Sequence, residues 1–366
     1  MQVAIVGGGQ LARMLALAGW PLGLRFAFLV NEGDDTRSVE GLGRVVKCEP
    51  GLEPSVLYEA LGRPVVITVE KEAVDTGLLE QLNTFCPVHP RPDVLRVCQN
   101  RRRQKLWLES LGIAVARHRF AHDAESLRTA AGELGFPLIV KAAEQGYDGR
   151  NQWRLADPSA LDRFVGQLAT GDWVVEEQVP FLREISLLAV RSAQGEIRFY
   201  PPTENRHVNG VLRTSLAPAI DLPEPALQAA CEKVRQMLQR TQYVGVLALE
   251  YFVLEDRLCL NEVAPRVHNS GHWTQQGSTT SQFENHLRAI LGWPLGACDA
   301  KGHAGMVNIL GTDAPPDALL SAAVTLHLYD KQKRPGRKLG HVNVRDDDRA
   351  KVEAELQRLE RRLGGG

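Results

Sequence analysis

The chain has 366 residues, of which 44% are hydrophobic, and its 43 Lys and Arg residues nearly balance its 44 Asp and Glu residues, for a formal net charge of -1. This length predicts two or three hydrophobic cores, because single cores stop growing at roughly 250 to 300 residues. The near-neutral charge excludes an overall field that draws in nucleic acid or an anionic membrane. The six scattered cysteines lack zinc-knuckle or redox-pair spacing, and no apolar run approaches the ~20 residues that span a bilayer. We expect a cytoplasmic multidomain protein with no nucleic-acid or membrane partner.

The first 98 residues predict a Rossmann-like α/β domain. The apolar strand of MQVAIV leads into a glycine turn, a helix of helical period and a second β-rich run, LRFAFLV. VVKCEP and PVVITVEKEAV continue the alternation, which is typical of a parallel sheet. We place a domain boundary near residue 98.

The glycine turn fits more than one ligand. Gly7, Gly9 and Ala12 match G-x-G-x-x-G/A between a strand and a helix, the context of a dinucleotide fingerprint. Glu32, near the end of the second strand, would then bind the ribose. Such turns also bind other anions or simply allow tight strand-to-helix packing. The turn leaves an NAD-dependent oxidoreductase as one hypothesis.

Two further domains follow, with an α+β character. A charged helix in NRRRQKLWLESLGI opens the second domain, 99–299, where strands increasingly follow strands through short turns such as SAQGE and so predict antiparallel pairing. A small lid subdomain occupies about 115–175. The third domain, 300–366, has short strands around the basic loop KQKRPGRKL. Apolar residues at helical spacing indicate a final amphipathic helix: Val352, Leu356, Leu359 and Leu363.

Two carboxylates are expected to meet on one hairpin. GVLALEYFV and RLCLNEV predict paired strands, and a turn centred on Asp256 places Glu250 opposite Glu262. Cross-strand Cβ atoms lie ~4.5 to 5.5 Å apart, so two ionised carboxylates there repel each other. A shared proton or a lysine would relieve this repulsion, but a hard divalent cation is the commoner functional solution. Because magnesium held by few carboxylates completes its shell with phosphate oxygens and water, the pair indicates a nucleotide.

An upstream lysine and three acids fit the same ligand. Lys141 lies late in an apolar strand and precedes a loop with Gly146 and Gly149, so it can reach a phosphate while the loop closes over it; an ordinary surface cation is the alternative. Strand-end acids follow: Glu176, Glu177 and Glu184. Acids in these positions can accept hydrogen bonds from an adenine amino group and ribose hydroxyls.

The stretch NEVAPRVHNSGHWTQ, residues 261–275, concentrates polar groups after a core strand. His268 and His272 have an i, i+4 spacing that suits zinc on a helix, but Pro265 and Gly271 oppose a helix across them. We therefore expect a polar loop that presents donors to a phosphorylated ring. For His272 we prefer a structural hydrogen-bonding role.

The order of these elements resembles the ATP-grasp superfamily. GGGQLARML, GYDGR, NGVLRTS, NEVAPRVHNSGHWTQ and RPGRKLGH are similar, from the first strand to the C-terminal domain, to the 5-(carboxyamino)imidazole ribonucleotide synthetases of purine biosynthesis. The resemblance implies an ATP-grasp fold with a Rossmann-like pre-ATP-grasp domain and a small β-rich C-terminal domain. It also implies an ATP-dependent carbon-nitrogen ligase that uses bicarbonate to carboxylate aminoimidazole ribonucleotide, with two magnesium ions and a homodimeric state.

The resemblance also implies site residues. Those implied to contact ATP are Arg101, Lys141, Gly146, Tyr147, Asp148, Gly149, Arg150, Asn151, Gln152, Glu176, Glu177, Gln178, Val179, Glu184, His207, Asn261 and Glu262. Glu250 and Glu262 would hold magnesium. Those implied to surround the ribonucleotide are Gln10, Leu11, Glu70, Arg266, Asn269, Ser270, Arg337 and Lys338. The candidates for the chemistry itself are Asp148, Arg150, His268 and Lys331.

The chain departs from the family pattern at two places. Asn151 stands where the family has a second glycine, which would stiffen the lid loop, and Arg101 lies in NRRR where an acid-arginine pair is usual. Other ATP-grasp ligases, such as the formate-using glycinamide ribonucleotide transformylase or biotin carboxylase, would share the metal hairpin but not RVHNSGHWTQ. An NAD oxidoreductase would share only the glycine turn.

Overall fold

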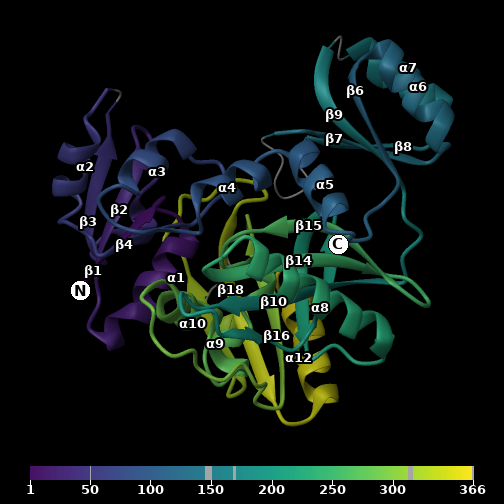
Figure 1. Cartoon of the computed structure of the whole chain (residues 1–366). Helices are drawn as coiled ribbons and strands as arrows, with labels where there is room; N and C mark the ends of the chain where they lie inside the picture. The colour runs from purple at the N-terminus through teal and green to yellow at the C-terminus, as the bar shows by residue number, and fades with distance from the viewer. Residues whose placement is uncertain (50, 145–150, 168–169, 312–315, 365–366) are drawn as a thin grey trace.

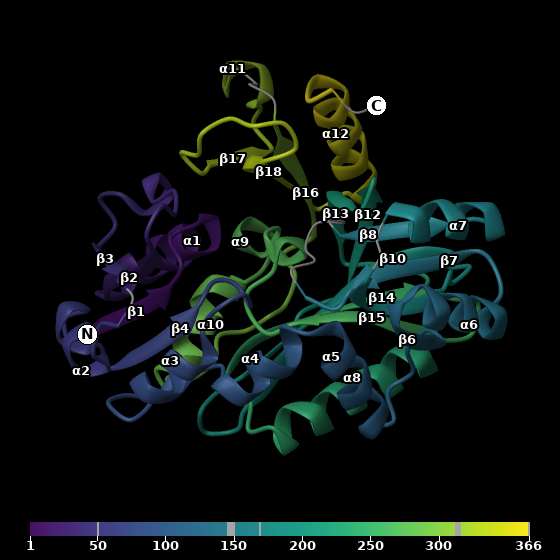
Figure 2. The same cartoon turned by 90° about the horizontal axis from the view of Figure 1, so that it is seen from above.

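The structure is a computed structural model that describes residues 1–49, 51–144, 151–167, 170–311 and 316–364 (Figure 1). In this part of the chain the strands form three sheets, and helices cover them. Seen from above, the N-terminal sheet, the lid sheet and the C-terminal strands lie on three different sides of the molecule (Figure 2). The functional residues therefore have to be assembled from separate parts of the chain.

The N-terminal sheet is parallel, with strand order β3-β2-β1-β4-β5, which confirms the Rossmann-like prediction. Its strands are β1 Gln2–Val6, β2 Arg25–Asn31, β3 Arg44–Cys48, β4 Val66–Val69 and β5 Val88–His89. Its helices are α1 Gln10–Gly19, η1 Trp20–Leu22, η2 Arg37–Val39, α2 Pro54–Ala60, α3 Thr76–Leu82 and α4 Pro92–Cys98. Successive side chains of β1 point to opposite faces of the sheet, so Val3 and Ile5 pack on the side of α1 and Ala4 packs in the core shared with α2 and α3.

The lid is an antiparallel sheet of order β6-β9-β7-β8, which stands apart from the rest at the upper right of Figure 1. Its strands are β6 His118–Asp123, β7 Leu138–Ala142, β8 Gln152–Leu155 and β9 Thr170–Glu177, and its helices are α6 Ala124–Leu134 and α7 Pro158–Gln167. Leu127, Phe164 and Trp173 belong to a hydrophobic core of its own. Lys141 on β7 and Glu176 on β9 thus reach the site from a separately packed unit.

The large sheet has the order β15-β14-β10-β12-β13-β16-β18-β17, with β11 paired to β10. Its strands are β10 Arg183–Arg191, β11 Ile197–Phe199, β12 Thr203–Val208, β13 Val211–Ala217, β14 Gly245–Val253, β15 Leu258–Ala264, β16 His303–Leu310, β17 Val324–Leu328 and β18 Lys338–Asp346. The helices packed around it are α5 Arg101–Ser110, α8 Glu224–Arg240, η3 Asn269–Gly271, α9 Thr274–Gly277, α10 Gln282–Ile290, α11 Pro316–Leu319 and α12 Arg349–Arg362. Because β16 pairs with β13, the C-terminal strands continue this sheet instead of forming one of their own.

A carboxylate of the protein fills the glycine turn. The Gly9 N–H donates to Glu70 Oε1 at 2.6 Å, and the Ala12 N–H donates to Glu70 Oε2 at 3.0 Å. Gly7 has φ +115°, and a Cβ there would lie 2.3 Å from Glu70 Cγ. Glu70 thus occupies the amides that a pyrophosphate would need. Glu32, the candidate ribose acid, instead pairs with Lys47 at the surface, 2.8 Å away. The glycines are explained by this close approach, and the dinucleotide hypothesis loses its structural basis.

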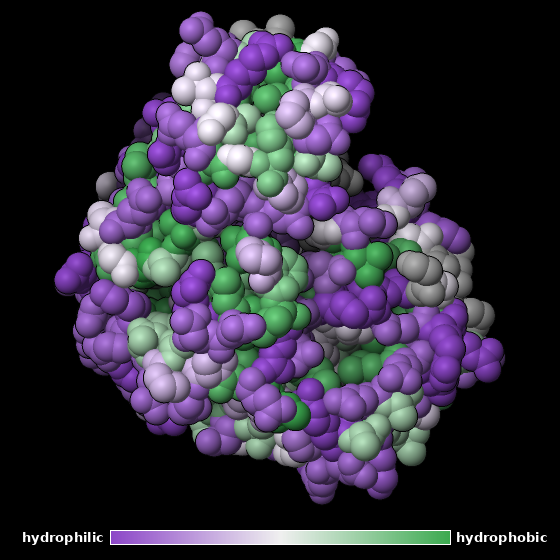
Figure 3. Space-filling model, turned by 90° about the vertical axis from the view of Figure 1, so that its right-hand side faces the viewer, coloured by the Kyte–Doolittle hydropathy of each residue, from purple (hydrophilic) through white to green (hydrophobic). Residues whose placement is uncertain are grey.

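Within the described residues, no helix is long and apolar enough to cross a bilayer. On the face shown in Figure 3, hydrophobic side chains form separate patches among hydrophilic ones.

We predict that Gly7→Ala lowers the free energy of unfolding by at least about 2 kcal/mol more than Gly33→Ala does. Both glycines have positive φ, but only Gly7 faces a neighbour that a Cβ would displace, since nothing lies within 4 Å of a Cβ at Gly33. Urea unfolding of the two variants measures the difference. Equal losses would show that Glu70 moves aside at little cost.

Candidate active site

A cavity of about 350 Å³ lies between the lid sheet and the large sheet. The predicted site residues in its wall are Arg101, Lys141, Gln152, Glu176, Glu177, Gln178, Val179, Glu184, His207, Glu250, Asn261, Glu262, His268, Asn269 and Lys338. These residues come from distant parts of the sequence. The fold therefore brings together in one cavity residues that belong to separate sequence motifs.

Glu250 on β14 lies opposite Glu262 on β15, as predicted, but the turn is not centred on Asp256. Beyond this pair the register shifts by one, so that Tyr251 faces Leu260 and Asn261 is an extra residue. This β-bulge leaves Asn261 outside the ladder. Its backbone carbonyl accepts a hydrogen bond from Lys105 Nζ at 3.3 Å, and its side-chain Oδ1 accepts one from Lys141 Nζ at 3.0 Å.

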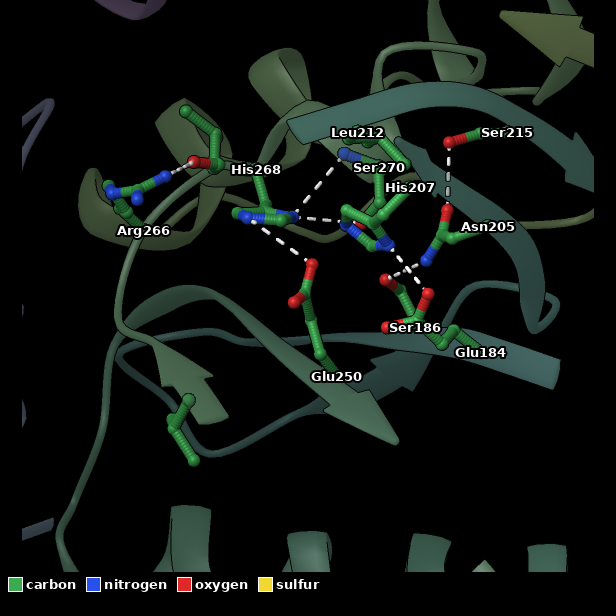
Figure 4. A network of polar contacts seen from close by, with 12 residues as sticks. Glu184, Ser186, Asn205, His207, Leu212, Ser215, Glu250, Arg266, His268 and Ser270 are labelled. Carbon is green, nitrogen blue, oxygen red and sulfur yellow. Dashed lines mark hydrogen bonds and ion pairs between the residues drawn. The ribbon is translucent and has the colours of Figure 1, made fainter. Parts of the chain in front are cut away.

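Glu250 lies in an environment that opposes the ionisation of its carboxyl group. Burial raises the pKa of Glu250 to about 7, and the charge of Glu262 acts in the same direction. His268 Nε2 lies 3.7 Å from Glu250 Oε1, too far for a hydrogen bond (Figure 4). Two acids that need positive charge and face a cavity form a fitting site for a divalent cation.

His268 also lines this cavity, and hydrogen bonds fix its side chain and the backbone on both sides of it. His268 is the N-cap of η3, and its Nδ1 lies 2.9 Å from Ser270 Oγ. The buried amide of Gln282 fixes the backbone on both sides, because its Oε1 accepts from the His268 N–H at 2.9 Å and its Nε2 donates to the His268 carbonyl at 2.7 Å. Burial lowers the pKa of His268 well below its usual value, and the charge of Arg266 adds to this. His268 is therefore a neutral imidazole.

His272 is structural, as predicted. No α-helix joins it to His268, because the intervening residues form the short 3-10 helix η3. Its ring packs against those of Phe283 and His341, with centroids 5.5 and 4.7 Å away, and its Nδ1 lies 3.3 Å from Gln282 Nε2. The two histidines therefore have different surroundings, which does not suit a shared zinc ion.

A cluster of buried charges lies where the lid meets the large sheet. Glu176 Oε2 is 2.7 Å from Lys141 Nζ, and Glu176 Oε1 is 2.9 Å from Lys105 Nζ. Burial alone would raise the pKa of Glu176, but the two lysines outweigh burial and lower it to about 2. Burial lowers the pKa of Lys141, while Glu176 opposes that shift.

Lys105 was missed in the sequence. It lies in a helix with four cations among its first five residues, a pattern typical of a solvated face. A signal was present, because Lys105 lies three residues before the apolar Leu108, and both are buried on the same helix.

A second acid-base pair lines the cavity opposite the lysines. His207 Nδ1 on β12 lies 2.9 Å from Glu184 Oε2 on β10 (Figure 4). Burial alone would lower the pKa of His207, but the hydrogen bond to Glu184 and the charge of Glu250 outweigh burial, and the pKa rises. Together the two side chains form a polar wall beside the metal candidates.

Lys331, a candidate for the chemistry, and two of the predicted ribonucleotide residues, Gln10 and Arg337, lie along the seam between the N-terminal domain and the C-terminal loop. Lys331 Nζ contacts Gln10 Oε1, and Arg337 Nη2 lies 3.0 Å from Asp35 Oδ2. Burial lowers the pKa of Lys331 to about 8, although the nearby Glu70 opposes the shift. These contacts show that the basic loop turns back toward the N-terminal domain.

Other predicted residues of this group fall into two kinds. Arg266 Nε forms an ion pair with Glu72 at 2.8 Å, and Leu11 and Ser270 are buried. Asn269 is only 8% exposed, yet neither atom of its side-chain amide has a hydrogen-bond partner among the described residues. A buried amide without a partner is costly, so a ligand that satisfies it would bind favourably.

The lid loop falls partly outside the part of the chain that the structure describes. Gly146, Tyr147, Asp148, Gly149 and Arg150 lie outside the described residues. Asn151 has φ +53°, a left-handed conformation that Asn tolerates better than most residues, which explains how it can stand where the family has glycine.

Arg101 lines the cavity from the start of α5. It donates from Nη1 to the Ala142 carbonyl at 2.9 Å, which places its guanidinium beside the end of β7.

Three family models match the chain. Residues 1–99 match the ribonucleotide synthetase preATP-grasp domain, residues 106–283 the ATP-grasp domain, and residues 304–355 the phosphoribosylaminoimidazole carboxylase C-terminal domain. These matches confirm the predicted fold class.

Full-length relatives agree with the models. The N5-carboxyaminoimidazole ribonucleotide synthase of Pseudomonas aeruginosa is 39% identical, over 98% of this chain and 99% of its own. The solved N5-carboxyaminoimidazole ribonucleotide synthetase of Thermus thermophilus is 40% identical, with a TM-score of 0.90 over 98% of each chain. An Aspergillus clavatus N5-carboxyaminoimidazole synthase, solved in complex with ADP and 5-aminoimidazole ribonucleotide, is 29% identical, with a TM-score of 0.89 over 99% of this chain and 98% of its own.

We predict that Glu250→Gln stabilises the metal-free protein at pH 8 but not at pH 4. The folded-state pKa of Glu250, about 7, lies above the ordinary value of 4.5, so ionisation costs stability as the pH rises from about 4.5 through about 7. The shift corresponds to on the order of 3 kcal/mol. Urea unfolding in a chelator at several pH values tests this, and a wild-type-to-variant difference that does not change with pH would contradict it.

Proposed function

The chain belongs to the family of the N5-carboxyaminoimidazole ribonucleotide synthases, and we propose how its cavity and seam perform that family's reaction. It is an ATP-dependent ligase of purine biosynthesis that carboxylates 5-aminoimidazole ribonucleotide. We propose bicarbonate as the carbon source, and ADP, phosphate and 5-(carboxyamino)imidazole ribonucleotide as the products. The observation that carries the proposal is the carboxylate pair Glu250 and Glu262, which shares one cavity with Lys141.

The nucleotide would lie between the lid and the large sheet. Val179 and Phe252 supply an apolar wall for the adenine, and Phe252 is backed by the ring of Phe181, 4.7 Å away. Backbone groups near Gln178 and Val179, after β9, would meet the base edge, and Glu184 would meet the ribose. The phosphates would then extend toward Lys141 and Arg101.

Two side chains would hold magnesium, Glu250 and Glu262, because they are adjacent, half-buried and line the same cavity. Bound there, it would offset the charge on the transferring phosphoryl group. Two ions are proposed, as in the family. The protein's own part is to fix both carboxylates on a sheet while Lys141 approaches from the lid.

Bicarbonate is a poor electrophile, so we propose that its oxygen first attacks the γ-phosphate of ATP to give carboxyphosphate. Carboxyphosphate hydrolyses readily, which requires a site that excludes water. The lid sheet covers one side of the cavity, and the loop 146–152 is proposed to close the remainder. The amine then attacks the carbon, or carbon dioxide released from it, while Asp148 or the neutral His268 takes the proton. Arg150 and Lys331 would stabilise the departing phosphate and the new carbamate.

Aminoimidazole ribonucleotide would occupy the seam next to the cavity. Arg337, which lies beside Asp35 at this seam, would bind its phosphate. Lys338 lines the adjoining cavity, and the side-chain amide of Asn269 has no hydrogen-bond partner among the described residues. Gln10, Leu11 and Glu70 would border it from the N-terminal domain, and Arg266 and Ser270 from the loop after β15. A cytoplasmic homodimer is proposed from the family alone.

We predict bicarbonate-dependent ADP release with aminoimidazole ribonucleotide, but not with glycinamide ribonucleotide or biotin. Glu262→Gln should lower turnover at least about a hundredfold without lowering the melting temperature, because it removes one carboxylate, and its repulsion of Glu250, without changing side-chain volume. A coupled ADP assay measures turnover. Release with glycinamide ribonucleotide instead would indicate another ATP-grasp ligase, and full activity of the variant would remove the metal assignment.

We predict that Arg337→Ala raises the KM for aminoimidazole ribonucleotide roughly ten- to a hundredfold, through loss of a charge-assisted contact of about 1.5 to 3 kcal/mol. The KM for ATP should barely move, because ATP is bound in the separate cavity. Arg334→Ala is the matched control, since Arg334 is exposed in the same loop. Steady-state kinetics separate the two constants; if both variants behave alike, the phosphate is bound elsewhere.

A further inference from the structure

Lys105 is a buried lysine that contacts residues lining the nucleotide cavity. The reaction proposed above gives it no role. Its side chain is 4% exposed, and its Nζ lies 2.9 Å from Glu176 Oε1 and 3.3 Å from the Asn261 carbonyl. It does not line the cavity itself, whereas its partners Glu176 and Asn261 do. Any effect of Lys105 on the nucleotide must therefore act through these partners.

The cluster carries one more positive charge than negative. Glu176 is also only 4% exposed, and it meets Lys141 Nζ at 2.7 Å on the oxygen that Lys105 leaves open. Two lysines and one glutamate give a net charge of +1. With Lys141 as its single partner, Glu176 would cancel the lysine's charge, and the pair would present no net charge to an anion.

We propose that Lys105 is a positioning residue that neutralises Glu176, so that Glu176 does not cancel the charge that Lys141 presents to the nucleotide's phosphates. The inference rests on the proposed placement of the nucleotide. The geometry supports it because each lysine takes a different oxygen of Glu176, and Lys141 is the one of the two that reaches the cavity wall. A net charge in a buried site costs free energy unless a ligand neutralises it. The phosphates of a nucleotide can neutralise the net positive charge of this cluster.

A simpler role for Lys105 would be to fasten helix α5 to the bulge at Asn261. That role depends on hydrogen bonds and not on charge. Lys105→Gln keeps donors near both acceptors, whereas Lys105→Met keeps only the apolar stem. The two roles therefore predict different outcomes for the same pair of variants.

The test compares the affinities of ADP and adenosine without metal, because only ADP carries phosphates. We expect Lys105→Met and Lys105→Gln to lower the ratio of ADP affinity to adenosine affinity about tenfold, with adenosine binding within about threefold of wild type. The double variant Lys105→Met/Glu176→Gln restores the net charge of +1, so its ratio should return to within about threefold of wild type. Glu176→Gln alone, with a charge of +2, should raise the ratio.

Equilibrium titration in a chelator measures each dissociation constant, and thermal melting reports folding. Lys105→Met leaves Glu176 with one ion pair, and the double variant buries no unpaired acid, so at least one of the two remains measurable. The inference is overturned if ADP and adenosine affinities fall together, if Lys105→Gln restores the ratio, or if the double variant does not. Failure of the proposed nucleotide placement is a different result, in which Glu176→Gln and Lys141→Met alter neither affinity.

Discussion

The repulsion between two facing carboxylates governs the arrangement of this site. Glu250 and Glu262 are fixed opposite each other by the strand register, and burial and the charge of Glu262 make ionisation of Glu250 unfavourable without a cation. The surrounding polar groups do not cancel this charge, because Lys105 and Lys141 bind Glu176 and because burial keeps His268 neutral. The two lysines thus lie beside the pair and not on it, an arrangement that suits a metal ion at the carboxylates and phosphate at the lysines.

Holding such a pair requires a rigid strand, yet β15 is the edge strand of the large sheet. Side chains of helix α5 form hydrogen bonds with the backbone along this edge. Gln104 donates from Nε2 to the Val263 carbonyl at 3.0 Å and accepts from the Val263 N–H at 3.1 Å, and Lys105 binds the carbonyl of Asn261. Both backbone neighbours of Glu262 are therefore fastened, and the edge that would otherwise be open to pairing is closed. The same helix thus fixes the metal candidates and neutralises Glu176.

Local patterns were enough to predict the parallel N-terminal sheet, the hairpin that brings Glu250 opposite Glu262, and the strand-end lysine, because alternation and turn residues act over a few positions. What they missed depends on long-range contacts. Glu70 lies 58 to 61 residues away in sequence from its hydrogen-bond partners in the glycine turn, and no residue near Gly7 indicates this contact. The bulge at Asn261 shifts the register by one residue, which alternation alone does not distinguish from a longer turn. Lys105 was hidden in a run of exposed cations, although it is buried.

The division of polar and apolar contacts suggests how the lid can close. The lid has its own hydrophobic core, and the small cluster of Ala116, Val179 and Cys259 joins it to the large sheet. The stronger connections between them are polar: Lys141 with Asn261, and Lys105 with Glu176. Since little apolar surface is shared, a change in the angle of the lid exposes little of it and costs little hydrophobic free energy. In the proposed mechanism, charge would then control lid closure, because an anionic nucleotide that neutralises the excess lysine would favour the closed arrangement that protects carboxyphosphate from water.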